Sequence, residues 1–417
     1  MTVLADWLAR QQAIHPKAID LSLERVMRVA RALQIDQPPH PVITIGGTNG
    51  KGSTVAFVAA LLAGAGHRVG VFTSPHLQRY NERIRIAGDE VTDAELVAAF
   101  ERIDAARGDT TLTYFEFGTL AALDLFVRAR VEFAVLEVGL GGRLDATNLV
   151  DADVAAVTSV GLDHMDWLGS SLESIGAEKA GIFRAGRPAV LGTADMPASV
   201  HAYIAAIGAR PVRSGREFTA HATATGFDFR CGERRWSNLP RPALQGRSQI
   251  GNAATALATL IAGGFDAGLD AGSIAAAIAT TKLPGRFQIV QREVEWLLDV
   301  AHNEPAAVEL ASNLRDRPCA GRTIAVCGIL GDKDVTAIVA ALAESIDEWV
   351  LVTLEGPRAI DAATLAARLP AGASVMALSQ DVASGCELAA ARARDDDRVL
   401  VFGSFLTVGP ALAWLGL

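Results

Sequence analysis

Short apolar runs alternate with longer amphipathic stretches along most of the chain, and this alternation predicts an α/β protein. Residues 41–45 read Pro-Val-Ile-Thr-Ile, a β-rich run, and a helical stretch follows from Thr54 to Ala65. Residues 133–138 read Phe-Ala-Val-Leu-Glu-Val. A nearly continuous apolar run of this kind is typical of a strand that is buried on both faces of a parallel sheet.

Further elements are predicted around these strands. Apolar positions recur at helical spacing in residues 4–33, which predicts two opening helices. Residues 213–240 differ, because aromatic residues stand among Thr, Gly and Arg, a pattern that favours short antiparallel strands. The other elements predicted before residue 283 are strands at 67–72, 154–158 and 189–191 and helices at 92–106, 115–130, 248–261 and 274–279.

The pattern restarts after the breaker pair Pro284-Gly285. Strands are predicted beyond it at 296–300, 323–327, 349–352, 374–377 and 399–402, with helical runs between them. The sequence therefore predicts a first α/β domain at 1–283, a hinge at 284–287 and a smaller Rossmann-like α/β domain at 288–417.

Composition narrows the possible partners and location. At 417 residues the chain is long enough for two or three domains, and its net charge of −9 argues against nucleic acid or an anionic membrane surface as the main partner. Four scattered cysteines form no C-x-x-C pair, which favours neither a zinc site nor a redox motif. No signal peptide and no apolar run of 18 residues is visible, so we expect a cytoplasmic protein.

A glycine-rich segment between the first strand and its helix carries the strongest chemical signal. Gly46-x-x-x-Gly50-Lys51-Gly52-Ser53 resembles a phosphate-binding loop, with one residue fewer in the spacer and an extra glycine before the serine. Glycines let several backbone N–H groups face one anion, Lys51 supplies a positive charge, and Ser53 offers a hydroxyl to Mg²⁺. The alternative is an ordinary glycine-rich turn. The strand before the loop and the helix after it favour nucleotide binding.

An acidic residue at the end of a neighbouring strand is the expected metal ligand of such a loop. Glu137 ends the apolar run 133–136 and stands directly before the glycine-rich segment 139–142. A single glutamate there could also be structural or solvated. Because the chain has no N-K-x-D signature, a GTPase switch is disfavoured.

Several short motifs in a fixed order resemble the dihydrofolate synthase/folylpolyglutamate synthase family, a branch of the Mur ligase superfamily. They cover the chain from about residue 19 to 405. The motifs are Gly47–Ser53, Ser74-Pro75-His76-Leu77, Tyr114-Phe115-Glu116, Glu137–Asn148, Asp163-His164, Glu178–Ile182 and Asp299–Asn303. The resemblance implies a P-loop, Mur-ligase-type domain with a parallel-rich sheet, joined to the smaller domain, with the active site in the cleft between them.

The resemblance also implies a reaction. ATP phosphorylates a substrate carboxylate, and the amine of L-glutamate then displaces phosphate from the acyl phosphate. The acceptor is dihydropteroate, which gives dihydrofolate, or a reduced folate whose polyglutamate tail is extended. The stretch Asp145-Ala146-Thr147-Asn148 is similar to bacterial forms that carry the first activity, which favours a bifunctional enzyme.

Residue roles are carried over motif by motif. The implied metal ligands for two Mg²⁺ ions are Ser74, Glu137, His164 and, as a carbamate, Lys179, because in this family the lysine that matches Lys179 is carbamylated by CO₂. Lys51, Glu137, His164 and Lys179 form the implied catalytic set. The implied ATP contacts are Thr48, Asn49, Gly50, Lys51, Gly52, Ser53, Asn252, Arg286, Asp299 and His302. The proline that such enzymes often carry after His-Asn stands one residue later here, at Pro305.

The pterin-bearing substrate is expected near three segments, with Phe115 stacking on the ring and Asp145 accepting from its N–H groups. These residues are Ile19, Asp20, Leu21, Thr113, Tyr114, Phe115, Glu116, Leu144, Asp145 and Ala146. Segments 328–334 and 403–405 are expected on the glutamate side.

We expect a monomer that acts on small molecules. Two alternatives remain: a cell-wall ligase, disfavoured because the loop at residue 46 leaves no room for a uridine-nucleotide domain, and a nucleotide-dependent binding switch.

Overall fold

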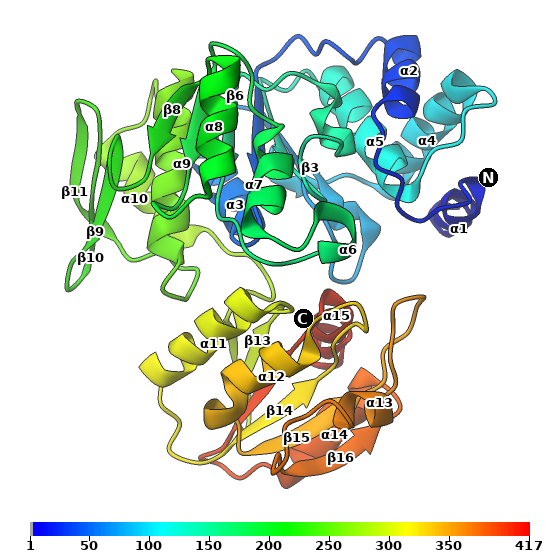
Figure 1. The fold of residues 1–417 in the computed structure, drawn as a ribbon, viewed down its shortest axis with the longest axis vertical. Helices are drawn as coiled ribbons and strands as arrows, with labels where there is room; N and C mark the ends of the chain where they lie inside the picture. The colour runs from blue at the N-terminus through cyan, green and yellow to red at the C-terminus, as the bar shows by residue number, and fades with distance from the viewer. Residues whose placement is uncertain (1–2) are drawn as a thin grey trace. The chain divides into compact units, whose positions relative to one another are not determined.

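The computed structural model describes residues 3–417, which form two compact units. The first contains the chain up to Gly161, Met165–Ala243 and Ile250–Thr281. The second contains Leu162–His164, Leu244–Gln249 and Lys282–Leu417. The two short segments of the second unit come from within the predicted first domain. Figure 1 shows the elements of both units.

An eight-stranded sheet forms the centre of the first unit, in the order β4-β3-β2-β5-β1-β6-β7-β8. Strands β2, β5, β1, β6, β7 and β8 run parallel, and β3 and β4 are antiparallel additions at one edge. The strands are β1 (Val42–Gly46), β2 (Val69–Phe72), β3 (Ile84–Ile86), β4 (Asp89–Glu90), β5 (Phe133–Glu137), β6 (Val154–Val157), β7 (Pro188–Leu191) and β8 (Arg210–Arg213). All residues of β1 and β5 are buried, as expected of central parallel strands.

Helices cover the sheet of the first unit. They are α1 (Leu4–Ile14), α2 (Glu24–Leu33), α3 (Lys51–Gly64), α4 (Asp93–Arg107), α5 (Tyr114–Ala129), α6 (Met165–Leu168), α7 (Leu172–Ala180), α8 (Ala198–Ile207), α9 (Gln249–Gly263) and α10 (Ala271–Thr280). Helix α3 packs against β1, β2 and β5, and α10 packs against α3. A hydrophobic core between α1, α2, α4, α5 and the sheet holds the start of α5 in place.

Two smaller features complete this unit. The antiparallel strands β9 (Phe218–Ala222), β10 (Gly226–Cys231) and β11 (Arg234–Pro240) form a sheet of their own, and β11 packs against α10. Short 3₁₀ helices lie at Tyr80–Arg83 and Ala146–Leu149.

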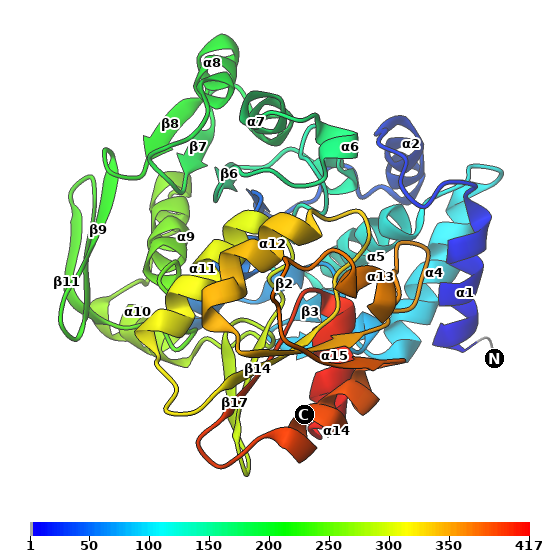
Figure 2. The ribbon, with the colours of Figure 1, turned by 60° about the horizontal axis from the view of Figure 1, so that its bottom comes forward.

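The second unit is a six-stranded sheet in the order β12-β13-β17-β14-β15-β16, parallel except for β12. Helices α11 and α12 pack side by side, and α14 packs against α15 (Figure 2). The strands are β12 (Gln288–Gln291), β13 (Glu295–Asp299), β14 (Thr323–Cys327), β15 (Glu348–Val352), β16 (Val375–Ser379) and β17 (Arg398–Phe402). The helices are α11 (Glu304–Asp316), α12 (Val335–Leu342), α13 (Ala362–Ala366), α14 (Val382–Arg392) and α15 (Phe405–Trp414), with a short 3₁₀ helix at Ala343–Ser345.

The α/β class and the strands and helices named from the sequence are confirmed, including the antiparallel strands within 213–240. The sequence pattern did not predict β8, whose residues are exposed or only partly buried, or β12, which begins and ends with glutamine. Helix α8 was not predicted either. The division of the chain into functional domains at 284–287 stays a prediction. Among the residues described, no helix is long and apolar enough to cross a membrane.

Candidate functional site

The carboxyl ends of β1, β2 and β5 bring three predicted segments to one edge of the first sheet. The glycine-rich loop leaves β1, Ser74 follows β2, and Glu137 ends β5. The backbone N–H of Ser74 donates a hydrogen bond to Oε2 of Glu137 over 3.2 Å, and Glu137 is buried. In open parallel sheets this edge is where ligands bind.

The glycine loop turns directly into helix α3. Gly50 is the N-cap of this helix with a φ of 83°, a conformation that glycine adopts without steric cost. The first intrahelical bond runs from the N–H of Thr54 to the carbonyl of Gly50. The N–H groups of the residues before Thr54 therefore lie ahead of the helical ladder, at the positive end of the helix dipole. This is the arrangement that binds phosphate in nucleotide-binding loops.

The preceding part of the loop is tied to the segment after β6. Thr48 donates its N–H to the carbonyl of Ser159 over 2.8 Å, and its hydroxyl donates to the carbonyl of Gly161 over 3.1 Å. The N–H of Asn49 donates to Oγ of Ser159 over 3.1 Å. Thr48 and Asn49, both predicted ATP contacts, thus hold the shape of the loop through these groups.

Two predicted catalytic lysines meet at one carbonyl oxygen of the loop. Nζ of Lys51 and Nζ of Lys179 each donate a hydrogen bond to the carbonyl of Gly47 over 3.0 Å. Two nitrogens at 3.0 Å from the same oxygen are at most about 6 Å apart, and Lys179 is only 5% exposed. Like charges this close repel unless an anion lies between them or one of them is neutralised.

Helix α9 brings Asn252 to the same loop. A Cβ on Gly50 would lie 2.6 Å from Oδ1 of Asn252, so the amide group of Asn252 is in contact with the start of α3. The two residues are about 200 positions apart in the sequence, and only the tertiary structure joins them.

The predicted acceptor segments are joined by an arginine that the sequence analysis missed. Arg25, in helix α2, lies 3.1 Å from Asp20 and 3.1 Å from Glu116. Glu116 is almost fully buried, and burial raises its pKa, while bonds from Thr113 and the charge of Arg25 act in the opposite direction. Thr113 and Glu116 also form a reciprocal cap at the start of α5. No motif pointed to Arg25, because its role depends on the packing of α2 beside α5.

Aromatic and acidic candidates surround the loop after β5. The ring of Phe115 lies against Gly139, where an added Cβ would be 2.6 Å from the ring, and its centroid is 5.8 Å from that of Phe72. Asp145 is 2% exposed and accepts from the N–H of Leu140 and from Thr147. Burial raises the pKa of Asp145, while these hydrogen bonds lower it. Asp145 thus fixes the loop that carries Leu144 and Ala146.

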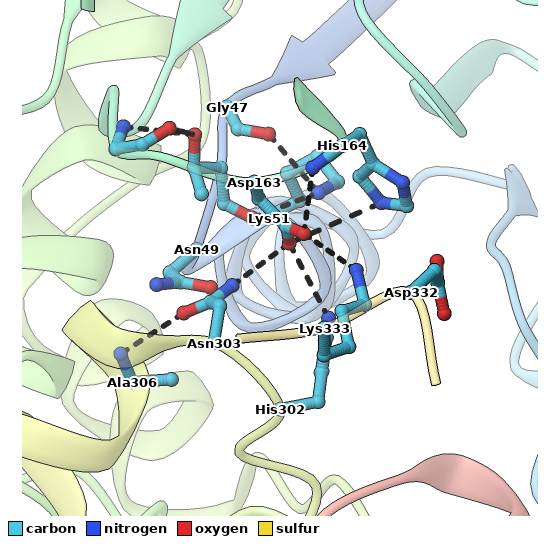
Figure 3. Close-up of polar contacts among 12 residues, drawn as sticks. Gly47, Asn49, Lys51, Asp163, His164, His302, Asn303, Ala306, Asp332 and Lys333 are labelled. Atoms are coloured by element: carbon cyan, nitrogen blue, oxygen red, sulfur yellow. Dashed lines mark hydrogen bonds and ion pairs between the residues drawn. The ribbon is translucent and has the colours of Figure 1, made fainter. Parts of the chain in front are cut away.

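In the second unit, Asp163 is the centre of a polar cluster (Figure 3). Its carboxylate pairs with Lys333, accepts from Nδ2 of Asn303 over 2.9 Å, and lies 3.6 Å from Nε2 of His302. Burial alone would raise the pKa of Asp163, but the bond from His302 and the charges of His164, Lys333 and His302 hold it well below its ordinary value. His164 adjoins this cluster, with a positive φ of 52° and its Nε2 3.9 Å from Asp163.

The other predicted ATP contacts of the second unit also group together. The guanidinium of Arg286 lies 5.1 Å from the ring centroid of Phe405, and His302 lies 6.3 Å from the same ring. Asp299, at the end of β13, accepts from the N–H groups of Phe287 and Ala301 over 2.8 Å each. Burial raises the pKa of Asp299 to about 6, although the charge of Arg286 lowers it.

The structure thus assembles two sets of the predicted residues, one in each unit. The loop from Gly47 to Ser53 joins Asn252 and Lys179 in the first unit, and Glu137 lies beside Ser74 at the same sheet edge. Arg286, Asp299 and His302 gather in the second unit. Within residues 3–417, no three His, Cys, Asp or Glu side chains converge as a metal site. The oxygen donors of Ser74 and Glu137 nevertheless suit Mg²⁺ at a phosphate site.

A P-loop α/β unit followed by a second parallel-sheet unit defines the class as Mur ligase, and sequence comparison agrees. Residues 45–260 match the Mur ligase middle domain, and residues 285–405 match the Mur ligase glutamate ligase domain. The chain is 46% identical to the dihydrofolate synthase/folylpolyglutamate synthase of Escherichia coli, over 97% of this chain and 94% of that one. It is 39% identical to the protein of the same name from Haemophilus influenzae, over 97% and 96% of the two chains.

Solved structures agree with the sequence relatives. E. coli FolC in complex with DHPP and ADP has a TM-score of 0.95 and 44% identity, covering 100% of this chain and 98% of that one. A bifunctional folylpolyglutamate synthase/dihydrofolate synthase with Mn, AMPPNP and L-glutamate bound has a TM-score of 0.92 and 45% identity, covering 100% and 99%. The chain belongs to the dihydrofolate synthase/folylpolyglutamate synthase family of Mur ligases.

Proposed function

We propose that this protein is an ATP-dependent ligase that adds L-glutamate to dihydropteroate and to reduced folylglutamates through an acyl phosphate. One observation carries the proposal. Lys51 and Lys179 donate to the same carbonyl, that of Gly47 in the loop before helix α3, and the buried carboxylate Glu137 stands at the end of the neighbouring strand β5. The ammonium group of Lys51 and the N-terminus of helix α3 form a site for a polyanion such as the phosphates of ATP.

The chemistry balances as two displacements. An oxygen of the acceptor carboxylate attacks the γ-phosphorus, and the bond to the β,γ-bridging oxygen breaks, which releases ADP. The glutamate nitrogen then attacks the acyl carbon, and phosphate leaves with the electron pair as the amine loses a proton. The loop 47–53 and Lys51 hold the phosphates in line for the first step.

A divalent metal belongs to this proposal. Ser74 and Glu137 would hold one Mg²⁺ beside the phosphates, and Glu137 and His164 would serve a second ion near the acceptor. When bound, such ions neutralise charge on the phosphoryl oxygens. Lys179 fits the carbamate proposal, because its neutral amine can add to CO₂ with loss of a proton, and the product carries a negative charge. Carbamylation would replace the repulsion between Lys179 and Lys51 by attraction.

Segments of the first unit form the proposed acceptor site. We assign its ring to the neighbourhood of Phe115 and Leu144, with Ile19–Leu21 held nearby because Arg25 joins Asp20 to Glu116. Asn252 belongs to the ATP site with the loop, and Arg286, Asp299 and His302 supply contacts from the second unit. A monomeric, cytoplasmic enzyme completes the proposal.

The test is ADP release with Mg-ATP and L-glutamate, with dihydropteroate or tetrahydrofolate monoglutamate as acceptor, and the product identified by mass spectrometry. We expect turnover with both acceptors, and none without glutamate. Turnover with one acceptor alone would assign a single activity; a relative from Lacticaseibacillus casei, 33% identical over 81% of this chain, is named folylpolyglutamate synthase only. ATP hydrolysis that needs neither acceptor nor glutamate would refute the proposal.

A further inference from the structure

Arg83, at the end of the 3₁₀ helix Tyr80–Arg83, is a buried cation. Its side chain is 8% exposed, yet among residues 3–417 no carboxylate oxygen lies within 4.0 Å of its guanidinium nitrogens. A buried charge is costly unless an opposite charge compensates it. Glu82 is the acidic residue next to Arg83 in the sequence. Its carboxylate already accepts hydrogen bonds from the N–H groups of Leu77, Gln78 and Arg79.

Three neutral rings surround the guanidinium instead. It lies 5.3 Å from the ring centroid of Tyr80 and 5.4 Å from that of Tyr114, and its Nε donates to Nδ1 of His76 over 2.8 Å. Burial and the charge of Arg83 together lower the pKa of His76 to about 4, although the charge of Glu82 acts in the opposite direction. At neutral pH His76 therefore brings no second positive charge to the guanidinium, which lies among aromatic rings.

The position of Arg83 links the two halves of the proposed site. Its backbone carbonyl accepts from the N–H of Thr73, the residue before Ser74, whose own N–H binds Glu137. On its other side, Tyr114 begins helix α5, which carries the proposed acceptor residue Phe115. Arg83 therefore adjoins the start of the acceptor helix through its side chain and the segment before Ser74 through its backbone.

We propose that Arg83 binds the carboxylate of the acceptor and so orients the group that is to be phosphorylated. The proposal rests on the proposed function, which supplies an acceptor with one reactive carboxylate. The juxtaposition that carries it is a buried guanidinium with no carboxylate partner among residues 3–417, which His76, Tyr80 and Tyr114 hold at the start of the acceptor helix, while its backbone binds the residue before Ser74. A guanidinium matches a carboxylate with two parallel N–H donors, and it offsets the negative charge that would otherwise repel the γ-phosphate.

The test compares two ligands that differ only in this group: a pteroate analogue with a free carboxylate, and its primary carboxamide. Both are measured without ATP, so that neither reacts. Their dissociation constants are measured for the wild-type protein, for Arg83→Gln and Arg83→Lys, and for Arg85→Gln as a matched control. Arg85 lies two residues away, is 43% exposed and pairs with Glu90. We expect wild type and R85Q to prefer the carboxylate by about 10- to 100-fold, R83Q to lose that preference, and R83K to keep part of it.

The outcomes separate a binding role from a structural one. If R83Q weakens both ligands equally, or if it retains the preference for the carboxylate, Arg83 only supports the loop and the proposal is wrong. If R83Q does not fold, the ligand preferences of R83K and of the wild-type protein are compared instead. A wild-type protein that does not prefer the carboxylate over the carboxamide refutes the proposal. Wild-type protein that binds neither ligand and forms no dihydrofolate would instead overturn the proposed function, and the role of Arg83 with it.

Discussion

Replacing Gly50 by alanine tests whether the start of helix α3 is shaped for nucleotide binding. The residue has a φ of 83°, where an L-residue costs roughly 1–2 kcal/mol more than glycine. The new Cβ would also lie 2.6 Å from Oδ1 of Asn252, which must retreat to at least 3.4 Å for ordinary contact. Moving the amide off its rotamer adds about 1 kcal/mol.

Gly66→Ala is a matched control, because Gly66 has a φ of 90° and an added Cβ there meets nothing within 4 Å. Both variants carry the backbone cost, but only Gly50→Ala carries the contact with Asn252. We expect Gly50→Ala to be about 1 kcal/mol less stable than Gly66→Ala in thermal unfolding, a difference of about 2–4 °C. The KM for ATP should rise about tenfold or more in Gly50→Ala alone, because the displaced groups lie where the phosphates are proposed to bind.

A double variant locates the cause. Asn252→Ala removes the amide that the new Cβ meets. The double variant Gly50→Ala/Asn252→Ala should therefore lose no more unfolding free energy than Gly66→Ala and Asn252→Ala lose together. Equal melting temperatures and equal KM values for ATP in Gly50→Ala and Gly66→Ala would refute the reasoning. They would show that Asn252 moves freely and that the loop does not depend on its N-cap conformation.

Three further predictions concern other groups. Native mass spectrometry of protein kept in bicarbonate should show one added CO₂ that Lys179→Arg abolishes, and ligase activity should fall in CO₂-free buffer and return with bicarbonate; an unmodified but fully active enzyme would contradict this. Because burial raises the pKa of Asp299 from 3.8 to about 6, the folded state holds this proton more tightly than the unfolded state. The free energy of unfolding should therefore fall by up to about 3 kcal/mol as pH rises from about 4 to 6, and urea titrations should show less of this dependence in Asp299→Asn. Arg25→Ala leaves the buried Glu116 unpaired and should lower the unfolding free energy by about 3 kcal/mol in urea, whereas Arg25→Ala with Glu116→Gln should recover most of the loss, and no recovery would mean that the pair is unimportant.

The sequence alone determined the features that depend on neighbouring residues. The apolar runs of β1 and β5 predict buried parallel strands because they leave no polar face, and the glycines before Lys51 predict a phosphate loop because only glycine turns so tightly. Glu137 was recognisable because it ends one of these strands. The order of the short motifs then indicated the family. Each motif is a run of neighbouring residues and can be recognised in the sequence, even though the residues of all the motifs act together in one reaction.

The tertiary structure decided which distant side chains meet. Local pattern could not show that Lys179 reaches the carbonyl of Gly47, or that Asn252 contacts Gly50, because both depend on where the fold places α7 and α9 relative to the loop before α3. It also gave no sign of Arg25 or Arg83, since an arginine on a helix normally lies in solvent and only its burial beside Glu116 or between tyrosines reveals another role. Charge is read from sequence, but its cost depends on burial, which only the fold determines.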